Sequence, residues 1–149
     1  MNVILGDFGI VTAMSASLVG LVLTVMGLVR SDATKIQLAA RLTGIVFAGS
    51  LFSFVILERA LITRDFSVLY VASNGSTRTA PLFNFATAWA SLEGSILLWA
   101  LVLAGYVMVV MFRFRHKLDD PLVGWALVAM YAVCIFFFGL MIGPADPFQ

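Results

Sequence analysis

Residues 121–142 have the sequence PLVGWALVAMYAVCIFFFGLMI, a run of 22 residues without a single charge. A helix needs roughly 20 consecutive apolar residues to cross the hydrocarbon core of a bilayer, so this run is long enough to do so. Its bulky side chains, with three consecutive aromatic residues at Phe136–Phe138, indicate a helix that faces lipid or a partner helix. The run therefore predicts a transmembrane helix.

Three further stretches toward the N-terminus meet the same length rule. Residues 94–112 and 8–29 are uncharged, and residues 36–57 are apolar except near their start, where we expect Arg41 to extend to the interface. No basic region precedes the first span and no small-residue cleavage site follows it, so we expect it to be a retained helix. The sequence predicts an all-α integral membrane protein with four transmembrane helices in a single membrane domain, residues 1–149.

The composition of the chain supports this class. Hydrophobic residues make up 62% of the chain and charged residues 11%, with a mean hydropathy of +1.05. A soluble domain carries roughly 25% charged residues. The nine basic and eight acidic side chains leave a net charge of only +1. These values exclude a soluble globular domain, a disordered chain and a nucleic-acid-binding protein.

Basic residues predict the orientation of the four spans. Lysine and arginine gather in and beside the loops 30–35 and 113–120, whereas neither terminus contains either residue. Loops rich in lysine and arginine remain in the cytoplasm. We therefore expect both short loops to be cytoplasmic, and both termini and segment 63–93 to lie outside.

Segment 63–93 is the only stretch long enough to build an external feature. The β-branched and aromatic residues 66–71 predict a short extended strand. The aromatic-rich stretch 82–90, which contains Trp89, predicts an interfacial helix at the level of the headgroups. Glu93 follows, where a carboxylate favours the positive end of a helix.

Few residues in this chain could perform chemistry. One cysteine, Cys134, excludes an internal disulfide or a thiol pair, and one histidine, His116, excludes a haem site with two histidine ligands from this chain. Glu58 near the outer end of the second span is either a functional carboxylate or an ion-pair partner of Arg59 or Arg64. We predict no catalytic residue and no metal ligand, and whether the chain belongs to an enzyme stays open.

Three motifs are carried by the outer segment and the end of the sequence. They are Asp65-Phe-Ser-Val-Leu-Tyr-Val-Ala-Ser-Asn74, Trp89-Ala-Ser-Leu-Glu-Gly-Ser-Ile-Leu-Leu-Trp99 and Ala145-Asp-Pro-Phe148. In this order they resemble the N-terminal part of the CcmF family, the large membrane subunits of the cytochrome c haem lyase. The resemblance departs from the family at Ala90–Leu92, where family members usually have Gly-Gly-His.

The resemblance implies a function in cytochrome c biogenesis. The chain would be a scaffold part of a split CcmF-like haem lyase, or a fragment of one, that attaches haem to apocytochrome c on the outer face of the membrane. The alternative is a non-catalytic structural or assembly subunit of a larger membrane complex without haem chemistry. The resemblance implies the plasma (inner) membrane of a bacterium, or the mitochondrial inner membrane for an organellar protein.

The resemblance also implies partners and site residues. Haem b of the assembled lyase would be bound outside this chain, which alone would bind no cofactor. Partners would be the C-terminal lyase chains with their tryptophan-rich segment, thiol-handling and haem-chaperone maturation proteins, and apocytochrome c. Candidate residues of an external wall or interface are Asp65, Phe66, Tyr70, Trp89, Glu93, Gly94, Ser95 and Trp99.

Overall fold

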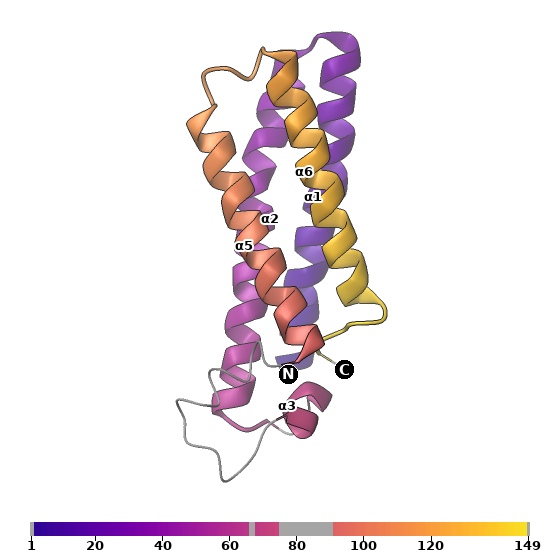
Figure 1. Ribbon diagram of the computed structural model, residues 1–149, viewed down its shortest axis with the longest axis vertical. Coiled ribbons are helices and arrows are strands. Elements are labelled where there is room, and N and C mark those ends of the chain that lie inside the picture. Colours follow the sequence, from indigo (N-terminus) through magenta and orange to yellow (C-terminus); the bar gives the residue numbers. More distant parts are fainter. Residues whose placement is uncertain (1, 66–67, 75–90, 149) are drawn as a thin grey trace.

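The computed structural model describes residues 2–65, 68–74 and 91–148, and shows a bundle of four long helices (Figure 1). With the labels of Figure 1, the helices are α1 (Asn2–Arg30), α2 (Ala33–Ile62), the short α3 (Leu69–Asn74), α5 (Leu92–Arg113) and α6 (Pro121–Ile142). The described residues contain no strand. All four long helices are long and apolar enough to cross a membrane, so the predicted all-α membrane fold is confirmed.

Helices α1 and α2 extend well beyond the spans that the sequence predicted. Helices α5 and α6 have 22 residues each, about 33 Å at 1.5 Å per residue, which is close to the thickness of a hydrocarbon core. Helices α1 and α2 have 29 and 30 residues and exceed that thickness. The hydropathy rule identifies only the uncharged apolar core of each span. The helical hydrogen bonds continue beyond that core, which makes the helices longer than predicted.

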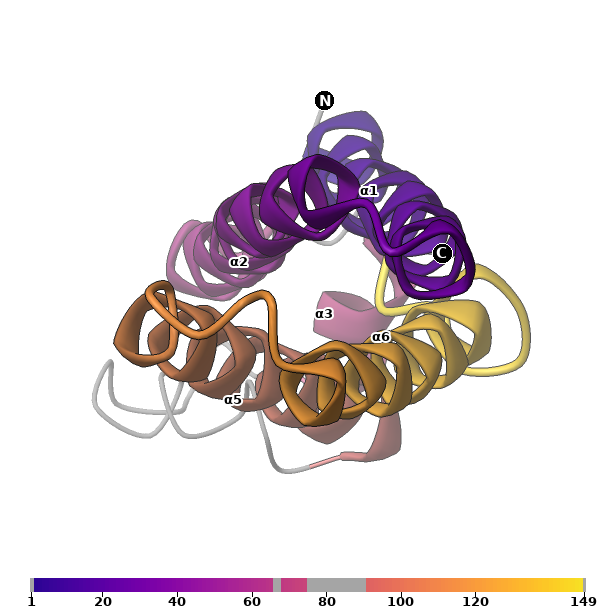
Figure 2. The same cartoon turned by 90° about the horizontal axis from the view of Figure 1, so that it is seen from above.

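The four long helices form a ring in which each contacts its two neighbours. The neighbouring pairs are α1–α2, α2–α5, α5–α6 and α6–α1 (Figure 2). Both chain ends and α3 lie at one end of the bundle, which we call the α3 end (Figure 1). The α1–α2 and α5–α6 connections lie at the opposite end.

Helices α1 and α2 approach each other closely through two glycines. A Cβ atom added to Gly9 would lie 2.7 Å from the carbonyl oxygen of Gly49, and the converse distance is also 2.7 Å. The hydroxyl of Ser53 donates a hydrogen bond of 2.7 Å to the carbonyl of Gly6 on the facing helix. Small residues of this kind allow helix backbones to pack closely where lipid provides no hydrophobic driving force.

Helix α6 is joined to its neighbours by Tyr131, which is fully buried. The ring of Tyr131 occupies the space over Gly20 of α1, because an added Cβ there would lie 2.2 Å from Cζ. The Tyr131 hydroxyl donates a 2.6 Å hydrogen bond to the carbonyl of Ala39 in α2. The bulky fourth span therefore has a buried face as well as an outer one.

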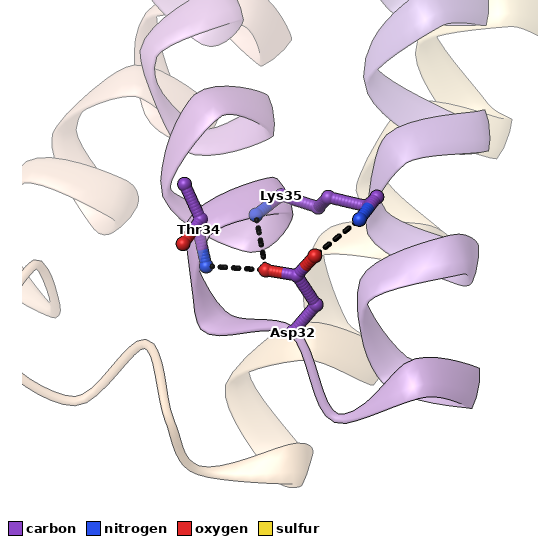
Figure 3. Close-up of polar contacts among 3 residues, drawn as sticks. All are labelled: Asp32, Thr34 and Lys35. Atoms are coloured by element: carbon purple, nitrogen blue, oxygen red, sulfur yellow. Dashed lines mark hydrogen bonds and ion pairs between the residues drawn. The ribbon is translucent and has the colours of Figure 1, made fainter.

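Carboxylates at the turn residues set where α2 and α6 begin. Oδ1 of Asp32 accepts hydrogen bonds from the backbone N–H groups of Thr34 at 3.0 Å and Lys35 at 3.4 Å, and the carboxylate also pairs with the Lys35 ammonium group (Figure 3). Asp120 accepts a hydrogen bond from the N–H of Leu122 at 2.9 Å. These contacts satisfy N–H groups that have no partner within the first helical turn.

Helices α1 and α2 end in the same way, although neither ends at a glycine. Ser31 and Arg64 have positive φ angles of 52° and 53°. After each of them the next residue, Asp32 or Asp65, donates its N–H to a carbonyl five residues earlier, at 2.8 and 2.9 Å. This pattern is a Schellman motif, which satisfies the last carbonyls of a helix.

Candidate functional site at the α3 end

The described middle part of the outer segment, residues 68–74, contains the helix α3 and lies at the end of the bundle (Figure 1). The strand predicted at residues 66–71 is wrong for residues 68–71, because the N–H of Ala72 donates to the carbonyl of Val68 and α3 begins at Leu69. Val68, Tyr70 and Val71 are buried, with exposures of 0%, 4% and 1%. Contact with the bundle therefore outweighs the β propensity of these residues.

Tyr70 connects this segment to the beginning of α5. Burial raises the pKa of the Tyr70 hydroxyl, while hydrogen bonds between Tyr70 and the side chain and backbone of Ser91 lower it. The nearby carboxylates of Glu93 and Glu58 also raise that pKa. The Ser91 hydroxyl in turn donates a hydrogen bond of 3.0 Å to Oε2 of Glu93. Tyr70, Ser91 and Glu93 thus join two sequence motifs that are about twenty residues apart.

Asp65 also connects separate segments. Its carboxylate accepts a hydrogen bond of 2.8 Å from Nδ2 of Asn2, the first described residue of α1. Its own N–H donates to the carbonyl of Ala60, and its carbonyl accepts from the N–H of Val68. Asp65 therefore fixes the turn between α2 and α3 against the start of α1.

The segment after α6 closes the same end of the bundle. The side chain of Phe148 is fully buried, and its ring lies over Gly6 of α1, where an added Cβ would be 2.2 Å from Cζ. The N–H of Phe148 donates a hydrogen bond of 2.8 Å to Oδ1 of Asp146. The last of the three sequence motifs therefore packs at the same end as the first two.

Glu58 lies near the end of α2, and its side chain is buried. It is only 8% exposed, and neither carboxylate oxygen has a hydrogen-bond partner within the described part of the chain. Arg59 and Arg64, its two expected ion-pair partners, are both exposed, and the ion pair is not formed there. A buried carboxylate without partners is costly, so this position points to a contact outside the described residues.

The structure places the remaining candidates unequally. Gly94 is buried, and Ser95 is half-buried with its hydroxyl bonded to the carbonyl of Leu92 at 2.9 Å. Trp99 is 63% exposed and lies one to two turns further along α5, away from the hydrogen bonds of Tyr70. Phe66, Trp89 and the predicted interfacial helix lie outside the described residues.

His116 and Cys134 lie in different parts of the bundle. His116, the only histidine of the chain, lies at the end opposite α3, and its Nε2 accepts a hydrogen bond of 3.1 Å from Nε of Arg115. Cys134 is buried inside the bundle on α6. Within the described ranges no group of three histidine, cysteine or acidic side chains could hold a metal ion.

Comparison with known proteins identifies relatives along nearly the whole chain. This chain is 33% identical over 145 residues to the cytochrome c-type biogenesis protein CcmF of Pseudomonas fluorescens. The aligned region covers 97% of this chain and 22% of that protein. The cytochrome c-type biogenesis protein CycK of Rhizobium meliloti is 32% identical over 150 residues, with shares of 99% and 22%. The chain thus spans about a fifth of the length of these relatives. No family model matches it.

A solved structure has the same fold. The chain superposes on part of the cytochrome c heme lyase CcmF with a TM-score of 0.93 and 36% sequence identity. The match covers all of this chain and 25% of the other. The four-helix bundle therefore has the same fold as one part of that longer chain.

Proposed function

Because this chain is similar over nearly its whole length to part of the cytochrome c-type biogenesis protein CcmF, we propose that it is a membrane subunit of cytochrome c maturation. Its task is that of a scaffold: residues 1–149 form one membrane unit within a CcmF-like haem lyase that joins haem to apocytochrome c. The observation that carries this proposal is the structural match, with a TM-score of 0.93 at 36% identity across the entire chain.

The proposed lyase needs more helices than this chain contains. The relatives are about four to five times as long as this chain. We therefore assign haem b and its ligands to the remaining part of the lyase, which carries the tryptophan-rich segment. The apolar exterior of the bundle supports contacts with further helices, since large side chains such as Trp99, Tyr106, Trp125 and Phe136 are more than 60% exposed.

The α3 end is assigned to the outer face of the inner membrane. The basic residues of the two short connections lie at the opposite end, which the positive-inside rule places in the cytoplasm. Both termini and segment 63–93 are then outside, where haem chaperones, thiol-handling proteins and apocytochrome c would meet the lyase.

Within the α3 end, we assign different tasks to the candidate residues. Asp65, Tyr70 and Glu93 hold the described part of the outer segment against the bundle through the hydrogen bonds described above, while Ser95 bonds to the carbonyl of Leu92 within α5. Trp99, with 63% exposure, is a contact residue for a neighbouring helix. Phe66, Trp89 and Gly94 complete the external wall in this proposal.

A non-catalytic assembly subunit is the second candidate function. It is favoured by Ala90–Leu92, which depart from the family pattern. In that case the bundle would serve as an anchor in a membrane complex without haem.

Purification of the tagged chain from its native membrane distinguishes the two functions. In mild detergent, a scaffold of the lyase should co-purify with polypeptide that carries the tryptophan-rich segment and should show a Soret absorption band. A stable complex of other membrane proteins without haem would overturn the lyase proposal in favour of the assembly subunit.

A variant at the α3 end provides a functional readout. Glu93→Ala removes the acceptor of the Ser91 hydroxyl and should lower the amount of haem-attached cytochrome c, while Asp119→Asn, an exposed carboxylate at the opposite end, should leave it unchanged. Unchanged cytochrome levels in the Glu93→Ala strain would remove that carboxylate from the proposal.

A further inference from the structure

A cleft between α2 and α5 at the end opposite α3 combines apolar walls with a basic rim. Its volume is about 480 Å³. Ala40, Gly44, Met108 and Met111 contribute to its wall, while Arg41, Arg115 and His116 contribute all of its charged or titratable side chains. No acidic residue lines it.

Neither arginine that lines this cleft forms an ion pair with a carboxylate of the described residues. The guanidinium of Arg115 lies over the ring of Phe112, 4.4 Å from its centroid, and its Nε donates to His116. Two guanidinium groups beside one cleft produce a positive potential that favours an anion.

A second cleft at the same end of the bundle has no basic side chain in its lining. It lies around the α1–α2 turn and the start of α6, with a volume of about 290 Å³. It is lined by Asp119 and Trp125 together with apolar and small residues, and by no basic side chain. Of these two clefts, the α2–α5 cleft is therefore the one with the charge to select an anionic ligand.

We propose that the α2–α5 cleft binds one anionic phospholipid, whose phosphate pairs with Arg41 and Arg115. A phosphate group is present both in a lipid headgroup and in free inorganic phosphate. The apolar wall of the cleft favours the lipid over the free ion. Ala40, Gly44 and Met108 extend along membrane-spanning helices, so acyl chains can lie against them while the phosphate remains at the rim. Basic pockets between transmembrane helices bind anionic headgroups by this combination of contacts.

The test measures lipid retention by the full chain. The chain in mild detergent is titrated with phosphatidylglycerol or with phosphatidylcholine of the same acyl chains, and bound lipid is counted by native mass spectrometry. We expect one tightly retained phosphatidylglycerol and no retained phosphatidylcholine. Arg41→Gln and Arg115→Gln should each weaken binding about fivefold. The controls Arg30→Gln and Arg59→Gln each remove one positive charge from a residue outside the cleft and should not weaken binding.

A second pair of variants keeps every charge and fills the cleft instead. No atom lies within 4 Å of a Cβ added to Gly44, which lines the cleft, or to Gly139 on α6, so leucine can be introduced at either position without a clash of its Cβ. Gly44→Leu should reduce retention of phosphatidylglycerol, and Gly139→Leu should not. Both changes favour helix formation, so loss of folding does not explain a loss of binding.

Several results would overturn the proposal. Equal retention of the two lipids would show that charge does not select the ligand, and unchanged binding in both arginine variants would exclude the basic rim. Full displacement of phosphatidylglycerol by millimolar inorganic phosphate would make free phosphate the ligand. A photocrosslinker in place of Met108, an uncharged residue of the cleft wall, that labels polypeptide and no lipid in the native membrane would show that another protein segment fills the cleft.

Discussion

Gly20 shows how a missing side chain can join helices. The ring of Tyr131 occupies the volume that a Cβ of Gly20 would take, and the Tyr131 hydroxyl then reaches the carbonyl of Ala39. Three helices of the ring therefore meet at one buried aromatic side chain. Gly44 is also a helical glycine, but it has open space where its Cβ would be.

Alanine at these two glycines should consequently have opposite effects. Gly20→Ala forces the Tyr131 ring to move and should lower the free energy of unfolding by about 1–3 kcal/mol. Gly44→Ala should raise it by up to about 1 kcal/mol, because alanine favours the helix. Unfolding of both variants in mixed detergent micelles, followed by helical circular dichroism, measures the difference. Equal effects would contradict the packing at Gly20.

Replacing Glu58 should have opposite effects on the stability of the isolated chain and on that of the complete assembly. Its carboxylate is buried without a partner among the described residues, so Glu58→Gln should stabilise the isolated chain by about 1 kcal/mol, since an amide costs less to bury than a charge. The same change should weaken the complete assembly if a partner there donates to the carboxylate. The first effect is measured by unfolding in micelles, and the second by recovery of co-purified polypeptide. A destabilised isolated chain would show that Glu58 is already satisfied.

At the scale of the helices, the sequence predicted the number, type and order of the spans and the end of α1, but it did not predict where α1 begins or where α2 ends. Both helices terminate at residues with positive φ angles that are not glycine, Ser31 and Arg64, so the usual signal for a helix end is missing. The helix α3 was missed for a different reason. Its β-branched and aromatic residues favour a strand locally, and only their burial under the bundle makes them helical.

The first turn of α2 should respond to pH through Asp32. Hydrogen bonding to Lys35 is the main cause of the lowered pKa of the Asp32 carboxyl. A lowered pKa stabilises the folded chain above the ordinary carboxyl pKa, and this contribution disappears as the pH falls through the lowered value. Acidification should therefore destabilise the wild-type chain more than Asp32→Asn, which keeps a capping side chain but does not titrate.

The comparison is made by unfolding at a series of pH values. The variant Asp119→Asn, which alters an exposed carboxylate in the α5–α6 connection, is the matched control and should follow the wild type. If all three chains lose stability in parallel, the cap of α2 makes no contribution to the acid response.

At the scale of the whole molecule, the motifs that the sequence marked converge at one end, although they are separated along the chain. Asp65 contacts Asn2, Tyr70 contacts Ser91, and Phe148 packs over Gly6. Hydropathy could not predict these contacts because each depends on the fold of the ring. The same limit applies to Glu58, whose burial depends on its neighbours rather than on its position in the span.

The orientation of the molecule can be tested with two cysteines at opposite ends. In a Cys134→Ala background, Ala72→Cys on the exposed side of α3 should react with a membrane-impermeant thiol reagent added to intact cells. Lys117→Cys in the α5–α6 connection should react only after the membrane is opened. The reverse pattern would place the α3 end in the cytoplasm.

The location of both chain ends beside α3 has an evolutionary consequence. Four crossings bring the polypeptide back to the side from which it started, so any helix joined after this bundle keeps the orientation that it would have without it. A polypeptide that gains or loses a four-helix unit of this kind would therefore keep the orientation of its other helices. A unit of this kind can be inherited as a module, exchanged between longer and shorter polypeptides while the membrane topology of its neighbours is conserved.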